Sequence, residues 1–230
     1  RLSNPASNES LLDALSDHVV EVRFDLKQVM RTILQSATYQ RSSLPLAENA
    51  DEPKYHSRYY PKRLMAEVML DSIDQVLGTT TRFNEIAFPG ADKQKTDFYA
   101  QGTRAIELFD ASVNSYFLKT FGRNPREITC ECERSDEPSM VQELHLSNGQ
   151  TLNPKLAANR NVLSESIAAG NSNQEIIRNL FQRALCREPQ ETELKRLLSV
   201  LAEYGESERR TGLQDVAWSI LTSTEFTFNH

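Results

Sequence analysis

The chain has 230 residues, which suits one large domain or two small ones, because domains usually hold about 100 to 200 residues. Hydrophobic residues make up 39% and charged residues 25%, so collagen-like and compositionally disordered classes are excluded. The 26 lysines and arginines face 32 aspartates and glutamates, and the net charge of −6 argues against nucleic-acid binding through phosphate contacts. No stretch approaches the roughly 18 to 20 consecutive apolar residues that cross a bilayer, so no transmembrane segment is expected in this chain.

The first sixty residues predict a pair of helices followed by a surface connection. Leucines recur at helical spacing in residues 7–22, behind a cap at Ser7 or Asn8, and we expect this stripe to be buried. Asp25 is expected to cap a second helix with the same pattern. Residues 42–57 contain serines, two prolines and Asn49 but little apolar periodicity, which favours a surface connection.

The middle of the chain predicts a third helix and then short elements. Pro61 suits the first turn of a helix, and the apolar spacing that follows continues to a stop at Gly78. Residues 103–108 alternate enough to predict a short strand. Ser112 is expected to cap a short helix that ends at Phe121.

Helices dominate the rest of the chain. One is predicted from Pro138 to Asn148-Gly149, and another from near Pro154 to a cap at Gly170. The last three are predicted at 173–185, about 189–204 and 212–222. Because strand alternation is almost absent, the predicted class is mainly α: a multi-helix, orthogonal or bundle-like domain with at most a short strand pair. The loop-rich middle, 79–137, is the predicted seam between two subdomains.

Cys130 and Cys132, with one residue between them, form a candidate metal or redox site together with His145. Thiolates and imidazole are ligands that zinc accepts, although structural zinc sites usually space paired cysteines two to four residues apart. Redox chemistry is an alternative because nearby arginines favour thiolate character. The third interpretation is that both cysteines are small apolar packing residues. Cys186 ends a helical stripe and is expected in the core.

Carboxylates and arginines alternate in the same segment. Glu131, Glu133 and Asp136 are the candidate catalytic residues, with Glu127 and Glu137 beside them. Paired carboxylates act as general acid and base when burial moves their pKa values apart. A solvated, salt-bridged loop has the same composition, so both interpretations stay open.

A basic stretch rich in tyrosine precedes the third predicted helix. Tyr55, Arg58, Tyr59, Tyr60 and Arg63 are the candidate binding residues. Tyrosine and arginine side chains stack on sugars or bases, and arginine holds phosphate or sulfate. The stretch therefore predicts a groove for a sugar or an anionic polymer. Tyrosines that attach a loop to a helical core are the alternative.

The common catalytic and cofactor signatures are missing from the sequence. It contains no Gly-x-Gly-x-x-Gly, Walker loop, His-Glu-x-x-His or Gly-x-Ser-x-Gly motif. It also lacks Cys-x-x-Cys-His, the motif that attaches c-type haem through two thioethers. No cofactor is therefore expected in this segment.

Several short segments, taken in order, indicate a protein family more specifically than any single motif does. They are Asn4-Pro5 with Leu11–Asp13, Ser36–Ser43, Arg63–Val68, Phe121–Arg123, Cys130–Ser135, Glu137–Ser139, Leu144–Gly149 and Ser223–His230. In these segments the chain resembles the C-terminal domain of unknown function of planctomycete-type cytochrome c multidomain proteins. The resemblance runs from the first residues to the last, so residues 1–230 are expected to be the latter portion of one helical domain.

The resemblance implies a large exported bacterial protein, in the periplasm, the cell envelope or outside the cell, with c-type haem in another domain. It implies as partners the other domains of the same polypeptide, and an extracellular polymer or a redox partner. The resemblance implies no catalytic residue for this chain. We therefore expect an accessory or interaction domain, and the alternatives are an enzyme domain acting on an extracellular polymer such as a polysaccharide, or the metal or redox site named above.

Overall fold

A computed structural model describes most of the chain. The described residues are 6–51, 55–88, 90–109, 112–123 and 139–229. The chain divides into two compact units, Arg1–Lys62 with His230 and Arg63–Asn229. The seam predicted within 79–137 stays a prediction, because part of that range lies outside the described residues.

The first unit contains two short helices and a connection. α1 (Glu9–Glu21) and α2 (Leu26–Leu34) begin at Asn8 and Asp25, whose side chains accept backbone N–H groups of the first turn. Both helices and both caps are confirmed. The expected burial of the first stripe is wrong, because neither helix contains a buried residue. Among the described residues of this unit, α1 and α2 pack against each other, and this contact leaves their side chains exposed or half-buried.

The remaining elements follow in chain order. They are β1 (Lys62–Arg63), α3 (Ala66–Leu77), β2 (Glu85–Ile86), β3 (Gln94–Lys95), η1 (Ala105–Glu107), α4 (Tyr116–Thr120), α5 (Met140–Asn148), α6 (Leu152–Ala157), α7 (Val162–Ala168), α8 (Asn173–Leu185), α9 (Glu191–Ala202), η3 (Glu206–Glu208), α10 (Arg209–Leu221), α11 (Thr224–Thr227) and β4 (Phe228–Asn229). The mainly α class is confirmed. In the described part of the chain, strands form two short pairs, β1 with β4 and β2 with β3.

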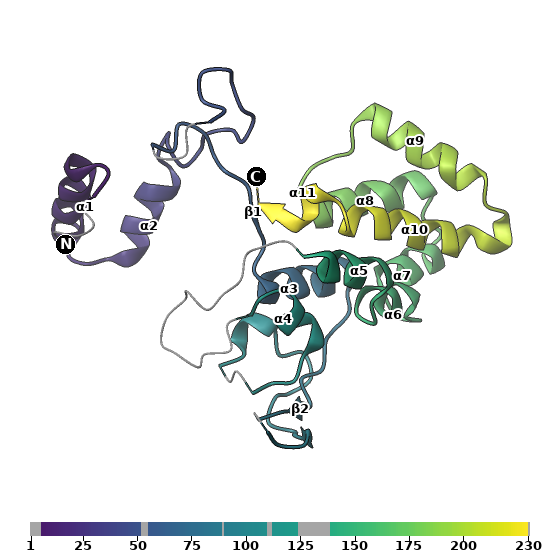
Figure 1. The fold of residues 1–230 in the computed structure, drawn as a ribbon. Helices are drawn as coiled ribbons and strands as arrows, with labels where there is room; N and C mark the ends of the chain where they lie inside the picture. Colours follow the sequence, from purple (N-terminus) through teal and green to yellow (C-terminus); the bar gives the residue numbers. More distant parts are fainter. Residues whose placement is uncertain (1–5, 52–54, 89, 110–111, 124–138, 230) are drawn as a thin grey trace. The chain divides into compact units, whose positions relative to one another are not determined.

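Two helices organise the second unit. α3 packs against η1, α4, α6, α7 and α8, and α10 packs against α6, α7, α8, α9 and α11. Figure 1 shows α8, α9 and α10 lying beside one another at the C-terminal end. The three predicted C-terminal helices are thus confirmed, and the α8 bounds agree with the prediction at both ends.

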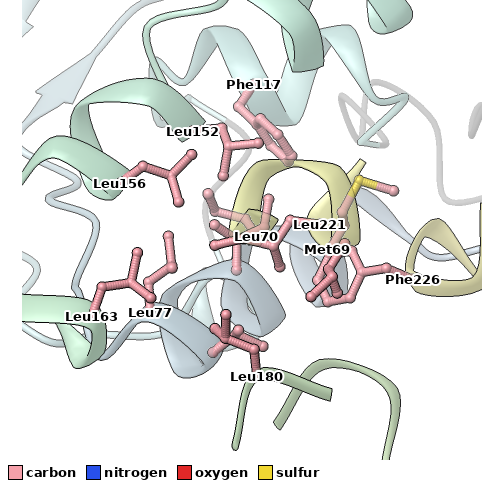
Figure 2. Close-up of a cluster of buried hydrophobic side chains, with 14 of the residues drawn as sticks. Met69, Leu70, Leu77, Phe117, Leu152, Leu156, Leu163, Leu180, Leu221 and Phe226 are labelled. Atoms are coloured by element: carbon pink, nitrogen blue, oxygen red, sulfur yellow. The ribbon is translucent and has the colours of Figure 1, made fainter. Parts of the chain in front are cut away.

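The core of the second unit is formed by apolar side chains that come mainly from its helices (Figure 2). Met69, Leu70, Leu163, Leu180 and Leu221 are each at most 1% exposed. Burying a side chain of this size contributes about 1.5 to 3 kcal/mol, so this cluster is the main source of stability in the unit. Cys186, which was expected in the core, is exposed, because the chain turns there with φ 54° as α8 ends.

Two predicted elements differ from the structure because groups from distant parts of the chain engage them. α3 begins at Ala66 rather than near Pro61, since the chain is extended there and Leu64 donates its N–H to the Thr227 carbonyl at 2.9 Å. The predicted strand at 103–108 is instead the 3-10 helix η1. Its N–H groups at Ala105 and Ile106 donate to the Asp71 carboxylate at 2.6 and 3.0 Å.

The short helix predicted from Ser112 begins later, at Tyr116. The Ser112 carbonyl accepts the Ala87 N–H at 2.8 Å, and Asn114 donates its N–H to the Glu85 carbonyl at 2.9 Å. The segment before Tyr116 therefore pairs with the β2 region instead of starting a helix. The helix predicted from Pro154 is divided into α6 and α7.

The division of α6 from α7 is stabilised by Asn161, which is 1% exposed. Its amide donates to the carbonyls of Lys155 and Leu156 at 2.9 and 2.8 Å, and its oxygen accepts the Ser164 N–H at 2.9 Å. One side chain therefore closes α6 and caps α7.

Within the described residues, no helix combines the length and the apolar character that crossing a bilayer requires.

Candidate functional site

A cavity of about 420 Å³ opens on the second unit where α3, α4, α5 and the turn after α5 meet. We name it the His145 pocket. It is lined by Leu70, Thr81, Ser115, Tyr116, Phe117, His145, Asn148, Gly149, Gln150 and Thr151. Leu70 and Phe117 also belong to the core cluster in Figure 2, so the apolar side of the pocket is fixed by the packing of the unit.

α5 positions the imidazole at the centre of the pocket. The helix begins at Ser139, which forms a capping box with Gln142, and its last turn carries His145. The ring is 8% exposed and its Nε2 lies 2.9 Å from the Thr151 hydroxyl. Burial lowers the pKa of His145 from its usual value of 6.5, so the ring is neutral at pH 7.

Aromatic rings surround this imidazole. The ring centroids of Tyr116, Phe117 and Phe121 lie 5.1, 5.7 and 6.1 Å from that of His145. Tyr116 is 63% exposed, so most of its ring is open to solvent, whereas the two phenylalanines are buried. The pocket thus has one accessible aromatic wall, and the remaining rings fix the imidazole.

The turn after α5 requires glycine. A Cβ at Gly149 would lie 2.1 Å from the His145 carbonyl oxygen and 2.7 Å from its Nδ1, closer than any side chain tolerates. The absence of a side chain lets the turn run directly past the imidazole. Asn148, Gly149 and Gln150 consequently form one rim of the pocket.

A closed network of charged and hydroxyl groups lies behind the pocket. Asp74 accepts hydrogen bonds from the hydroxyls of Thr79 and Thr81 at 2.7 and 2.6 Å, and it pairs with Lys155. Lys155 also donates to the Thr81 hydroxyl at 2.9 Å. The Lys155 and Asp74 side chains are only 13% and 14% exposed and compensate each other, so the network adds no net charge.

A second cavity, of about 320 Å³, contains an arginine held between two carboxylates. Arg187 donates to Glu193 through two hydrogen bonds of 2.8 Å and to Glu225 at 2.6 and 2.8 Å. These contacts raise the pKa of Arg187, and the arginine lowers the pKa of Glu193 to about 2. Arg187 and Glu193 therefore stay charged at neutral pH, and the contacts of Arg187 join the end of α8 to α9 and α11.

The predicted binding residues of the first unit form an internal contact. The Arg58 guanidinium lies 4.0 Å from the centroid of the Tyr60 ring and donates to the carbonyls of Ser43 and Ala50 at 3.3 and 3.2 Å. Tyr59 donates its N–H to the Ser42 carbonyl, and Tyr55 is exposed. Arg58 thereby holds the connection together, which agrees with the alternative interpretation of a fixed loop.

The fifth predicted binding residue, Arg63, belongs to the second unit. It donates to the Gln142 side chain, and its guanidinium lies 5.9 Å from the Phe121 ring centroid. Binding of a sugar or an anionic polymer by these five residues stays a prediction.

The remaining predicted site residues lie outside the described part of the chain. They are Glu127, Cys130, Glu131, Cys132, Glu133, Asp136 and Glu137. Their proposed catalytic and metal roles stay predictions, and His145 is the one member of the metal set that the structure describes. Among the described residues, histidine, cysteine and carboxylate side chains do not gather in a group of three that could hold a metal ion.

Sequence analysis missed the other residues of the His145 pocket. The pocket joins Leu70, Tyr116 and Gln150, and more than thirty residues separate each of them from the next along the chain. No spacing pattern in the sequence connects such distant positions. The local signal was the turn Asn148-Gly149 directly after a predicted helix that carries a histidine.

Comparison with protein families matches residues 1–201 to PSD1, described as "Protein of unknown function (DUF1553)". No curated protein and no solved structure matches the chain. The match includes the first unit and the whole His145 pocket. The chain therefore belongs to the PSD1 (DUF1553) family of proteins of unknown function.

Proposed function

We propose that this chain is a helical accessory or interaction domain of a large exported bacterial protein whose c-type haem is bound in another domain. Membership of an uncharacterised domain family is compatible with this role. The resemblance of the ordered sequence segments to planctomycete-type cytochrome c proteins supports the choice of parent protein. The proposed location is the periplasm or the cell envelope.

A group of three aromatic side chains, two exposed and one half-buried, carries the proposal. We name Phe98, Tyr99 and Phe109 the aromatic patch, because their ring centroids lie 5.2 to 5.6 Å from one another. Phe98 and Phe109 are 68% and 62% exposed. Clustered, exposed aromatic rings are typical of protein contact surfaces, since they bury a large apolar area at low entropic cost. The patch is the proposed contact surface for another domain of the same polypeptide.

Two charged clusters in the described part of the second unit also favour a non-catalytic role. Arg187 is bound by Glu193 and Glu225, and Asp74 by Lys155 and two threonines. Groups that are saturated by their neighbours stabilise the fold, whereas an acid or base in catalysis needs an accessible proton.

The first experiment is an absorption spectrum with haem staining of the full-length native parent protein. We expect covalently bound c-type haem, together with fractionation into the periplasm or the cell envelope. A parent protein without haem would overturn the proposed setting.

The second experiment tests the aromatic patch by chemical crosslinking and mass spectrometry of the same full-length protein. The double variant Phe98→Ala/Phe109→Ala is expected to reduce crosslinks between this chain and the other domains several-fold. Tyr39→Ala, an aromatic residue of the first unit that is 54% exposed, is the matched control and should leave them unchanged. Equal crosslinking in the double variant and the control would contradict an interaction role for the patch.

A further inference from the structure

We propose that the His145 pocket binds one uncharged sugar ring of a neutral oligosaccharide. This inference goes beyond the accessory role, because it assigns a ligand class to a cavity that the aromatic patch does not include. The pocket combines one open aromatic wall, a rim of amide side chains and an uncharged interior. Its volume of about 420 Å³ falls within the range of about 300 to 1,000 Å³ that is usual for small-molecule sites.

The aromatic wall suits the apolar face of a pyranose. Tyr116 is 63% exposed while its ring is braced against His145, with centroids 5.1 Å apart. An aromatic ring carries negative charge on its face, and the C–H groups on a sugar face carry partial positive charge. A sugar ring stacked on Tyr116 therefore gains electrostatic attraction as well as buried apolar area.

The rim supplies hydrogen bonds of both kinds. Asn148 and Gln150 line the pocket, and neither side chain is hydrogen-bonded to a residue that the structure describes. Each amide offers two donors and an acceptor, which matches sugar hydroxyls that both donate and accept. The Thr151 hydroxyl lies next to them and is oriented by the imidazole 2.9 Å away.

Charge selects a neutral ligand over an acidic or basic one. None of the described residues that line the pocket has a charged side chain at pH 7, since His145 is buried and neutral. The charges beside Thr81, on Asp74 and Lys155, are paired with each other. A carboxylate or sulfate entering this space would lose water without meeting a cation among the described residues that line it, which disfavours it.

The test is saturation-transfer NMR on the full chain with cellohexaose, mannohexaose and xylohexaose as neutral probes, followed by affinity measurement for the probes that bind. A sulfated and a uronate-containing oligosaccharide are the charged probes. We expect at least one neutral probe to bind and the charged probes to bind more weakly. Absence of transfer to every neutral probe, or stronger binding of the charged probes, would overturn the proposal.

Two variants locate the binding. Tyr116→Ala should weaken the affinity about tenfold, the effect of losing one aromatic stacking contact. Gln150→Ala should weaken it several-fold, and its exposed position makes a folding defect unexpected. Tyr39→Ala is the control for removal of an exposed tyrosine and should bind as the unmodified chain does. Unchanged affinity in both pocket variants would place any binding elsewhere.

The result of the oligosaccharide-binding test does not depend on whether the chain has the proposed accessory role. Phe98→Ala/Phe109→Ala should keep oligosaccharide binding, and Tyr116→Ala should keep the interdomain crosslinks. Failure of one proposal is therefore distinguishable from failure of the other.

Discussion

At the scale of single residues, polar side chains of the second unit mainly hold backbone ends and helix junctions. Asp71 accepts the first N–H groups of η1, and Asn161 joins α6 to α7. Arg209 and Arg210 likewise donate to carbonyls of the loops that follow α7 and α6. A buried backbone group without a partner costs about 1 to 3 kcal/mol, so these side chains contribute to stability through the groups they satisfy.

The first prediction at this scale concerns Arg187. Replacing it with alanine removes the guanidinium that pairs with both the Glu193 and the Glu225 carboxylates. The three side chains are 31% to 33% exposed, so solvent screening reduces the effect, and we expect a loss of about 2 kcal/mol in the free energy of unfolding. Urea denaturation measures this loss.

Low pH should also remove the stabilisation that comes from the contact between Arg187 and Glu193. The pKa of Glu193 is about 2 in the folded chain against a usual 4.5, so its stabilising effect is present above pH 4.5 and is lost as the pH falls towards 2.

Arg178→Ala is the control for the Arg187 variant. The pair of Arg178 with Glu188 is about half exposed, so its loss should change the free energy of unfolding by less than about 0.5 kcal/mol. Equal losses for both arginines would show that the Arg187 contacts add nothing.

The second prediction concerns the pH response of His145. Burial lowers its pKa in the folded chain, so below pH 6.5 the unfolded state takes up a proton that the folded state resists. Stability from this group is therefore complete above pH 6.5 and declines as the pH falls. His145→Gln should show a smaller drop in Tm between pH 7.5 and pH 5.5 than the unmodified chain, and an identical drop would contradict the burial of a neutral ring.

At the scale of elements, local caps explain where most helices start and tertiary contacts explain the exceptions. Asn8, Asp25, Ser139, Ser172 and Ser223 each accept a backbone N–H in the first turn of their helix. α3 has no such side-chain cap at Met65, and its start is fixed instead by the extended segment before it. A cap alone does not make a helix start predictable, because Ser115 and Asn161 cap the starts of α4 and α7, which the sequence does not predict.

The prediction at this scale concerns the end of α3. Gly78 has φ 67°, and an added Cβ would lie 3.1 Å from the Val162 side chain. Gly78→Ala should therefore cost about 1 to 2 kcal/mol through left-handed backbone strain. Gly205 has φ −69° and open surroundings, so Gly205→Ala is the matched control and should be neutral or slightly stabilising. Thermal unfolding of the two variants tests the difference, and equal Tm values would contradict it.

At the scale of the whole molecule, the two units differ in how much core they contain. The buried hydrophobic cluster comes entirely from residues of the second unit, between Ala66 and Phe226. α1 and α2 contain no buried residue, although both have well-formed caps. Caps define where a helix begins, but burial supplies most of its stability in a folded protein.

This difference predicts unequal hydrogen exchange. Amides of α1 and α2 should exchange at least about 100-fold faster than those of α8 and α10, because opening the first two helices exposes little new apolar surface. Hydrogen exchange of the full chain, followed by mass spectrometry of its peptides, measures both units in one sample. Comparable protection in α1 and α8 would show that the first unit is stabilised by contacts other than its own.

The sequence alone determined the features that depend on neighbours within a few residues. The apolar period located α8, Asp25 located α2, and Gly78 marked the end of α3. These signals are local because a helix satisfies its backbone within one turn and buries one face. The mainly α class followed from the same periodicity.

Only the tertiary structure decided the features that join distant parts of the second unit. Asp71 turned a predicted strand into η1 from 34 residues away, and Thr227 kept Leu64 out of the third helix. The His145 pocket likewise needs Leu70, Tyr116 and Gln150 from three separate segments. Such contacts arise when packed helices bring their faces together, and a single sequence carries no periodicity that records which faces will meet.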